Sequence, residues 1–481
     1  MIDRQEILEF AGEIRLDPNV VEKDYILGWM LAGISQHPRS RETWLFKGGT
    51  CLKKCFFETY RFSEDLDFTL LDSAHVNEAV LRETFAEIGQ WVYDESGVEL
   101  PDASRSFEIY ANPRGKYSAQ GRVGYRGPLQ RQGDLPRVRL DLTDDERLVH
   151  AGERKRVHHP YSDEPEEGIQ ILSYSFEEVF AEKLRALVER ERPRDLYDVI
   201  HLHRRQAGAD RASVRQILQA KCEFKGIPLP TFAALDASPH HAALRADWEQ
   251  MLAHQLPELP PFDSFWDELP ALFAWLEREE VKPHRPTMGA LRADIDSSWS
   301  MPAMAHSWHA EGIGAPLEII RFGAANRLCV ELDYRDEQGT LGTRVIEPYS
   351  LRRTKTGDLL LYAVRSEDGQ DRSYRVDRIQ GARVTKQTFS PRYEVELSLA
   401  GPVQAPEISR PARAQFSPPF RAQRRSTSRT RVFGQARYVF RCPICQKKFE
   451  RSEYDSTLRP HKGKNGYPCP GRTGYYETTK Y

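Results

Sequence analysis

Two aspartates alternate with apolar residues in the segment 65–71, which reads DLDFTLL. Its apolar members favour a buried strand: Leu66, Phe68, Leu70 and Leu71. Residues two apart in a strand share a face, so Asp65 and Asp67 point to the same side. Two like charges about 5 Å apart repel each other by roughly 3 kcal/mol at an effective dielectric constant of 20. Because a divalent metal ion is the usual means of offsetting such repulsion, the segment predicts a strand that carries a metal site.

A glycine pair, Gly48 and Gly49, precedes this strand and lies between the apolar run 44–46 and a helical pattern. A glycine turn that opens a helix presents free backbone N–H groups, which suit a phosphate. Arg61 and Ser63 are candidates to contact a phosphate and to cap the turn. The alternative for Arg61 is a surface ion pair with one of two nearby glutamates, Glu58 or Glu64.

A third carboxylate, Asp141, stands between Leu140 and Leu142 in a run that alternates as a strand does. Its ordinary interpretation is a solvent-facing side chain. Beside Asp65 and Asp67 it would complete an oxygen cage for one or two Mg²⁺ ions.

The segment 175–205 predicts two helices. Ser175 and Glu178 form a capping-box start, and Lys183 falls on the side of the apolar stripe. A lysine there either extends to solvent or reaches into a cleft to hold a phosphate. Pro193 ends the first helix; Asp195 then suits an N-cap, whereas Asp198 lies one turn further on.

These residues form an ordered set of motifs that resembles the AbiEii/AbiGii toxin family of nucleotidyltransferase-like proteins from bacterial toxin–antitoxin and phage-defence systems. The motifs are Val21-Glu22-Lys23-Asp24-Tyr25, Lys47-Gly-Gly-Thr50, Arg61-x-Ser63-x-Asp65-Leu-Asp67, Glu182-Lys183-Leu and Arg194-Asp195-Leu-Tyr-Asp198. The resemblance covers roughly residues 15–280. It implies a polymerase-β-type nucleotidyltransferase fold with Asp65 and Asp67 as ligands of Mg²⁺.

The same resemblance implies that Lys183 and Asp198 are catalytic or nucleotide-binding. Six further positions stand in the motifs as candidates for binding the nucleoside triphosphate (NTP) substrate: Lys47, Gly48, Gly49, Thr50, Arg61 and Ser63, with Asp195 as a seventh. Fifteen residues separate Gly49 from Asp65, somewhat more than in the general nucleotidyltransferase pattern.

The chain has 481 residues, so it exceeds a single core, and its patterns predict an α+β protein of several parts. We expect the following parts: a nucleotidyltransferase domain (1–205), a helical extension (206–300), a small β-barrel (310–400), a Pro/Arg/Ser-rich linker (401–436) and a compact terminal module (437–481). No apolar run is long enough to span a membrane, and the scattered cysteines suit a reducing compartment, so we expect a cytoplasmic protein.

Charge is divided unevenly along the chain. Residues 401–481 contain 17 Lys and Arg against 5 Asp and Glu, whereas the whole chain has 69 against 71. A basic tail on an acidic body suits a polyanion partner for the tail, and a solubilising linker is the alternative.

Residues 315–400 resemble a WYL domain, a small Sm-like β-barrel of ligand-responsive regulators of bacterial defence. The matching stretches are 321–334, 347–349, 361–362 and 374–379, and the name triplet is only approximated by residues 360–362. Tyr362, Arg375 and Arg378 are candidates to bind a nucleotide or a single strand by stacking and phosphate contact. The alternative is a purely structural barrel.

The terminal module carries a C-x2-C-x15-H-x7-C pattern made by Cys442, Cys445, His461 and Cys469. Four soft ligands at such spacing predict a closed structural zinc site, whose metal would supply folding energy to a module with little core. Basic and aromatic residues around it suit nucleic-acid contact.

We therefore expect a toxin that transfers a nucleotide from an NTP to an RNA acceptor, with the 3′ end of tRNA as one candidate and a cognate antitoxin as a partner. The alternative is a ligand- or nucleic-acid-sensing WYL regulator whose transferase domain is inactive. A kinase or protein-nucleotidylating activity would share the same metal chemistry.

Overall fold

The computed structural model describes residues 1–57, 61–111, 115–205, 209–277, 285–289, 292–299, 314–398, 437–442, 447–451, 458–459, 461–462, 468–469 and 475–480. The chain divides into two compact units, Met1–Ile408 and Ser409–Tyr481. Among the described residues, no helix combines the length and the apolar character needed to cross a membrane.

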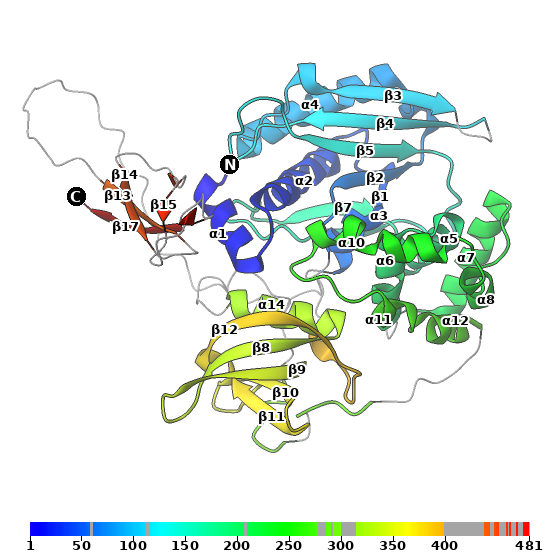
Figure 1. The fold of residues 1–481 in the computed structure, drawn as a ribbon. Helices are drawn as coiled ribbons and strands as arrows, with labels where there is room; N and C mark the ends of the chain where they lie inside the picture. The colour runs from blue at the N-terminus through cyan, green and yellow to red at the C-terminus, as the bar shows by residue number, and fades with distance from the viewer. Residues whose placement is uncertain are drawn as a thin grey trace, which may run out of the picture. The chain divides into compact units, whose positions relative to one another are not determined.

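The first unit is built around a seven-stranded mixed sheet in the order β3-β4-β5-β2-β1-β7-β6 (Figure 1). Its strands are β1 (Trp44–Lys47), β2 (Asp65–Leu70), β3 (Ser106–Ala111), β4 (Tyr117–Gly124), β5 (Arg137–Thr143), β6 (Glu153–Val157) and β7 (Ile169–Ser173). The helices that precede β1 or join its neighbours are α1 (Arg4–Ile14), α2 (Pro18–Gln36), α3 (Gly48–Cys51) and α4 (Glu78–Ser96).

One face of this sheet is apolar because β2 alternates as the sequence predicts. Leu66, Phe68 and Leu70 are buried, and the strand ends at Leu70, so Leu71 is exposed rather than part of the expected buried run. Helix α4 covers the apolar face: the Phe85 ring lies 5.3 Å from that of Phe107 on β3. The polar face, which carries Asp65 and Asp67, is therefore the opposite one.

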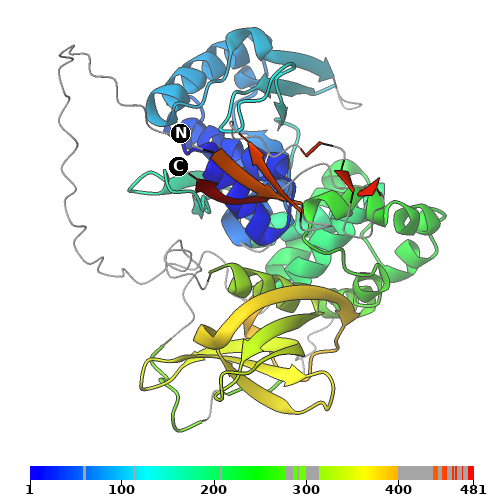
Figure 2. The same cartoon turned by 60° about the vertical axis from the view of Figure 1, so that its left-hand side comes forward.

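A run of helices follows β7 and is shown in green in Figure 2. The helices from α7 onward lie in the range 206–300, where a helical extension is expected. Its members are α5 (Phe176–Arg190), α6 (Pro193–Arg204), α7 (Arg211–Lys225), α8 (Phe232–Asp236), α9 (His241–Ala246), α10 (Trp248–Leu252), α11 (Asp263–Trp266) and α12 (Leu269–Glu277). Ser175 caps α5 by accepting a hydrogen bond from the Glu178 N–H at 3.2 Å, which confirms the predicted start.

The rest of the first unit is helix α14 (Gly314–Asn326) and a five-stranded antiparallel sheet in the order β11-β10-β9-β8-β12. The strands are β8 (Leu328–Arg335), β9 (Leu341–Arg353), β10 (Leu359–Arg365), β11 (Asp371–Arg375) and β12 (Ile379–Thr388). All five lie within the range 310–400, where the sequence predicts a small β-barrel. β11 and β12 form the two edges, so the expected closure into a barrel is not among the strand pairings of the described residues.

The described part of the second unit includes these strands: β13 (Arg437–Arg441), β14 (Lys448–Arg451), β15 (His461–Lys462), β16 (Pro468–Cys469) and β17 (Tyr475–Lys480). β13 pairs with β14 and β17, and its small core contains Phe440, Cys442 and Leu458. The mixed α+β class expected from the sequence is thus confirmed.

Candidate active site

The polar face of the large sheet brings the three predicted carboxylates together through strand register. Asp67 on β2 is the register partner of Asp141 on the parallel strand β5, and of Lys47 on the antiparallel strand β1. Asp65, two residues earlier, shares the face of Asp67. The register thus brings together the three carboxylates that the sequence singled out. β5 and β1 flank the two aspartates on opposite sides.

The glycine turn follows β1 directly, and Gly48 and Gly49 open α3. A Cβ atom at Gly48 would overlap the carboxylate of Asp67, and the φ angle of Gly48 is 81°, so glycine is required on both counts. Thr50 donates a hydrogen bond of 2.5 Å from its hydroxyl to the carbonyl oxygen of Asp65. These contacts fix the turn against the strand that carries both aspartates.

The chain after α3 forms one π-helical turn, Leu52–Phe56, before the residues that lead to β2. This extra turn lies in the segment between Gly49 and Asp65 that the sequence showed to be long. Ser63 lies against the turn, with its hydroxyl oxygen 3.1 Å from the position of a Cβ atom at Gly49. Its predicted role in capping or phosphate contact stays a prediction.

Electrostatics at the carboxylates favour a cation. Burial raises the pKa of Asp67 to about 6, and the neighbouring charge of Asp141 adds to the rise although Lys47 and Lys183 oppose it. Burial, followed by the charge of Asp65, likewise raises the pKa of Asp141. The ionised pair is thus disfavoured until positive charge is supplied.

The donor chemistry suits Mg²⁺, which prefers carboxylate oxygens and usually takes one or two of them together with substrate phosphates. As the side chains stand, no group of three or more His, Cys, Asp or Glu residues in the described parts of the chain is close enough to hold one ion. Asp65 and Asp67 as the residues that would hold the metal stay a prediction. Asp141 as a third ligand stays a prediction.

A buried ion-pair network joins Arg61 and Lys183 to Asp198. Arg61 donates two hydrogen bonds of 2.8 Å to the two carboxylate oxygens of Asp198, and Lys183 Nζ lies 2.7 Å from Asp198 Oδ2. A third Arg61 nitrogen donates to Gln255 at 3.0 Å. Burial alone would raise the pKa of Asp198, but Arg61 and Lys183 outweigh it and hold that pKa well below its ordinary value.

This network corrects two sequence-based alternatives. Arg61 is buried against Asp198 on α6 and does not form a surface pair with Glu64, whereas Glu58 lies outside the described residues. Lys183 is also buried and does not extend to solvent. A direct contact of Arg61 with a phosphate stays a prediction, since the guanidinium of Arg61 already bonds Asp198 and Gln255.

Asp195 has a partner that the sequence did not suggest. Arg190 donates hydrogen bonds of 2.6 and 2.8 Å to its carboxylate, and Lys183 Nζ lies 3.7 Å away. The N-cap of α6 is Arg192, so Asp195 is not the cap that we expected. Its carboxylate instead helps to hold the start of α6 against α5.

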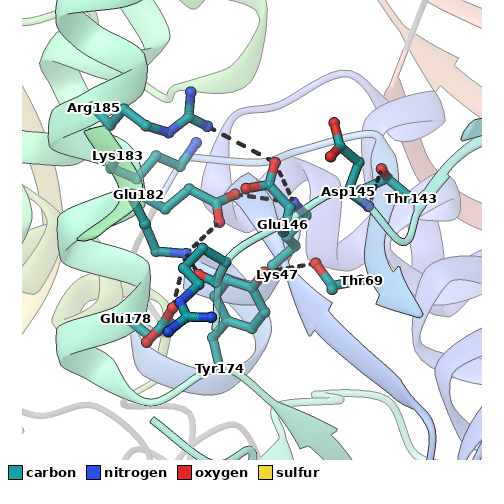
Figure 3. Close-up of polar contacts among 12 residues, drawn as sticks. Lys47, Thr69, Thr143, Asp145, Glu146, Tyr174, Glu178, Glu182, Lys183 and Arg185 are labelled. Carbon is teal, nitrogen blue, oxygen red and sulfur yellow. Dashed lines mark hydrogen bonds and ion pairs between the residues drawn. The ribbon is translucent and has the colours of Figure 1, made fainter. Parts of the chain in front are cut away.

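Figure 3 shows a second charged cluster, in which Lys47 lies between the carboxylates of Glu146 and Glu182. The distances from Lys47 Nζ are 3.6 Å to Glu146 and 3.2 Å to Glu182. Burial alone would lower the pKa of Lys47, but the two carboxylates raise it well above its ordinary value. On the other side of Glu182, Lys221 from α7 bonds Glu178 at 2.8 Å and lies 3.5 Å from Glu182.

The members of this cluster other than Lys47 were not predicted from the sequence as site residues. Glu182 stands in a family motif and was therefore detectable, whereas Glu146 and Lys221 carry no local pattern. The cluster ties β1 to α5 and α7, so it holds the glycine turn at a fixed distance from Lys183. Lys47 as a nucleotide-binding residue stays a prediction.

The residues predicted to bind a nucleotide or a single strand in the WYL-like region belong to the five-stranded sheet and its connections, not to the large sheet. Tyr362 is 5% exposed, with Gly289 against its ring, so the ring has no open face for stacking. Arg375 pairs with Asp358 and Asp377, and Arg378 pairs with Glu337. A ligand would have to displace these pairs, and the proposed binding role stays a prediction.

The predicted zinc ligands are described only in part. Cys442 is buried, and His461 Nδ1 lies 2.9 Å from the carbonyl oxygen of Arg459. Cys445 lies outside the described residues, as does the side chain of Cys469. The zinc site stays a prediction.

Comparison with known families agrees with this geometry. The family model for the nucleotidyl transferase AbiEii toxin of a type IV TA system matches residues 29–275, more than half of the chain. The chain belongs to the AbiEii toxin family. In this AbiEii protein a WYL domain model matches residues 316–384, which confirms the second resemblance. No curated protein matches the chain.

Solved structures with some similarity to the AbiEii protein include MenT4, a nucleotidyltransferase toxin from Mycobacterium tuberculosis H37Rv, and JHP933 from Helicobacter pylori. MenT4 is 19% identical, with a TM-score of 0.40 and coverage of 58% of this chain and 89% of its own. JHP933 is 17% identical, with a TM-score of 0.35 and coverage of 55% and 95%. The proteasome accessory factor B/C of Arthrobacter aurescens is 16% identical, with a TM-score of 0.16 and coverage of 45% and 32%.

Proposed function

We propose that this AbiEii protein transfers a nucleotidyl group from an NTP to the 3′-hydroxyl of an RNA, with the 3′ end of tRNA as the first candidate. The observation that carries the proposal is the register that sets Asp65 and Asp67 beside a glycine turn in which no side chain fits at Gly48. Carboxylates next to the backbone N–H groups at the start of a helix suit a nucleotide bound through its phosphates and a metal ion.

In the proposed reaction the acceptor oxygen attacks the α-phosphorus of the NTP. A new oxygen–phosphorus bond forms, the bond to the β-phosphate oxygen breaks, and pyrophosphate leaves. The hydroxyl proton passes to Asp141, the carboxylate next to Asp67 on the side away from the glycine turn. Mg²⁺ held by Asp65 and Asp67 would supply positive charge to the phosphates.

The other residues of the site act on the phosphates and on each other. The N–H groups of the glycine turn and the ammonium group of Lys183 bind the triphosphate. Asp198 is 0% exposed and bonds both Lys183 and Arg61, so it orients Lys183 and does not touch the acceptor. This geometry supports a positioning role for Asp198.

Incubation of the full chain with labelled NTPs, Mg²⁺ and total RNA tests the proposal. We expect label in RNA with the wild type and none with Asp65→Ala. Asp94→Ala, an exposed aspartate on α4 bonded only to Gln90 among the described residues, is the matched control and keeps full transfer. Absence of transfer by the wild type, or equal transfer by Asp65→Ala, would sink the proposal.

The second candidate function is a WYL-type regulator whose transferase domain is inactive. It is favoured by direct bonding between the two domains: Asn326 Oδ1 on α14 accepts hydrogen bonds from Tyr197 at 2.9 Å and His201 at 3.2 Å on α6. A thermal shift with NTP and Mg²⁺ separates the candidates, because only the transferase requires nucleotide at Asp65 and Asp67. A cognate antitoxin and a polyanion for the basic segment 401–436, which lies outside the described residues, are proposed partners under either function.

A further inference from the structure

The polar face of the large sheet continues beyond the carboxylates over β5, β4 and β3. Residues that alternate with the buried ones on these strands point to the face of Asp65 and Asp67, and helix α4 covers only the opposite face. Exposed or half-exposed members of this surface, which we call the acceptor face, are Arg137, Arg139, Asp141, Gln120, Arg122, Glu108 and Tyr110.

Strand register arranges the acceptor face in rows. In one row, Asp65 is followed by Arg139 on β5 and by Arg122 on β4. In the next row, Asp67 is followed by Asp141 and by Gln120. The row with the arginines therefore begins at the proposed metal carboxylate and runs outward to the edge of the sheet.

Arg122 and Arg139 face each other directly across two antiparallel strands, where like charges destabilise the pairing. In the part of the chain that the structure describes, Arg139 has no ion pair, and Arg122 has only Glu108 at 3.9 Å. Arg137 lies two residues before Arg139 on the same face. An anion between the paired guanidinium groups would remove the repulsion, and a phosphate diester suits two arginines.

The position of this pair relative to the glycine turn distinguishes two anions. Phosphoryl transfer needs the attacking and leaving oxygens roughly in line on opposite sides of the phosphorus. The glycine turn lies at β1, on one side of β2, and the arginine pair lies on β5 and β4, on the other side. Pyrophosphate therefore leaves toward β1, and the acceptor approaches over β5 and β4.

We propose that the acceptor face binds the single-stranded 3′ end of the acceptor RNA, an inference that rests on the proposed function. Arg122 and Arg139 bind a backbone phosphate next to the attacking nucleotide. Tyr110 on β3 stacks on a base: it is 45% exposed and is the register partner of the small Ser118. Three strand spacings of about 4.8 Å separate the row positions of β2 and β3, a span of roughly 14 Å.

The test uses the full chain and a short single-stranded RNA with a photoreactive nucleotide near its free 3′ end. Cross-links mapped by mass spectrometry are expected on peptides of β3, β4 and β5. Cross-links confined to the basic segment 401–481 would overturn the inference. Because cross-linking needs no transfer, it reports on the acceptor face even if the proposed function fails.

Arginine variants give the quantitative test. We expect Arg122→Gln/Arg139→Gln to lower the affinity for the RNA at least tenfold. The magnitude of the slope of log affinity against log salt should fall by about 0.7, the value for one lost phosphate contact on a single strand. The NTP-dependent thermal shift should stay unchanged. Arg154→Gln/Arg156→Gln removes the same charge from β6 at the far edge of the sheet and should leave the RNA affinity unchanged.

Tyrosine variants test the stacking. Tyr110→Ala should weaken RNA binding. Tyr110→Phe should bind RNA as tightly as the wild type, because stacking needs the ring alone. Tyr117→Ala is the control: Tyr117 is 58% exposed on the neighbouring strand β4 but occupies the opposite alternation. Equal RNA affinity of Arg122→Gln/Arg139→Gln and of its control would refute the inference. Transfer of the nucleotide label to protein, without RNA cross-links on the acceptor face, would point to a protein acceptor instead.

Discussion

Gly48 lies so close to Asp67 that no side chain fits at position 48, because a Cβ atom there would overlap the Asp67 carboxylate. The backbone of Gly48 also has a φ angle of 81°, which L-residues rarely adopt. The glycine turn and the acidic strand therefore depend on each other: Asp67 can lie beside the N–H groups of the turn only if position 48 has no side chain.

Gly48→Ala should consequently abolish transfer by displacing Asp67. A shift of about 1 Å at a reacting group can cost roughly a hundredfold in rate, and we expect at least that loss of transfer in an assay with labelled NTP. Gly339→Ala is the control, since Gly339 has a φ angle of 84° with open space around it, and so carries the backbone strain alone. Equal loss in both variants would show that strain, and not the Asp67 contact, is responsible.

Asp67→Asn should raise the melting temperature of the metal-free protein above pH 6. Burial and Asp141 raise the folded pKa of Asp67 to about 6 from its ordinary value of 3.8, so ionised Asp67 costs stability above pH 6. In the wild type this destabilisation decreases as the pH falls from 6 toward 3.8, because Asp67 then becomes protonated in the folded state. The difference in melting temperature should therefore be largest above pH 6 and vanish near pH 4.

Added Mg²⁺ provides the complementary measurement to the Asp67→Asn melting curves. It should raise the melting temperature of the wild type at pH 7.5 in the presence of NTP and leave Asp67→Asn unchanged. An equal rise in both proteins would place the metal elsewhere.

The sequence predicted the parts of the site that rest on periodicity. Asp65 and Asp67 share a face because a strand repeats every two residues, and Asp141 joins them because its own run alternates. Register between strands far apart in the chain decided whether these faces would meet, and no local pattern encodes that register. The structure supplies it, through the pairing of β2 with β5.

Pairings between distant residues could not be predicted in the same way. Arg61 and Asp198 are 137 residues apart and meet only because α6 packs behind the glycine turn. Nothing local distinguishes an arginine that bonds a phosphate from one that bonds a buried carboxylate. The same holds for Glu146, whose contact with Lys47 depends on the packing of the segment after β5.

Asp198→Asn should destabilise the protein strongly, because Arg61 and Lys183 would remain buried without their carboxylate. Breaking such a pair costs about 3 to 5 kcal/mol, measurable by urea unfolding at pH 7. Since Arg61 and Lys183 hold the pKa of Asp198 below 3.8, the stabilisation is complete above pH 3.8 and is lost as the pH falls further. Asp195→Asn is the control: its partner Arg190 is 48% exposed and can turn to water, so the loss should be smaller.

Asn326→Ala should loosen the contact between the WYL domain and α6. Tyr197 and His201 both donate to Asn326 Oδ1, and each buried donor left without an acceptor costs about 1 to 3 kcal/mol. We expect a lower melting temperature and, because Tyr197 precedes Asp198, a lower transfer rate with an unchanged affinity for RNA. Thr385→Val removes a hydrogen bond to Cys329 within the WYL sheet and should affect stability alone.

One zinc ion per chain is expected in the C-terminal unit, measured by elemental analysis of the purified protein. A module of residues 437–481 is short, and modules of this length usually need a metal or another constraint to fold. Cys442→Ser should therefore lose the zinc and expose the unit to proteolysis, whereas Cys222→Ser, which alters a buried cysteine of α7, should retain both zinc and resistance. Zinc bound equally by both variants would mean that Cys442 is packed as a small apolar residue and that the unit is stabilised by something other than the predicted ligand set.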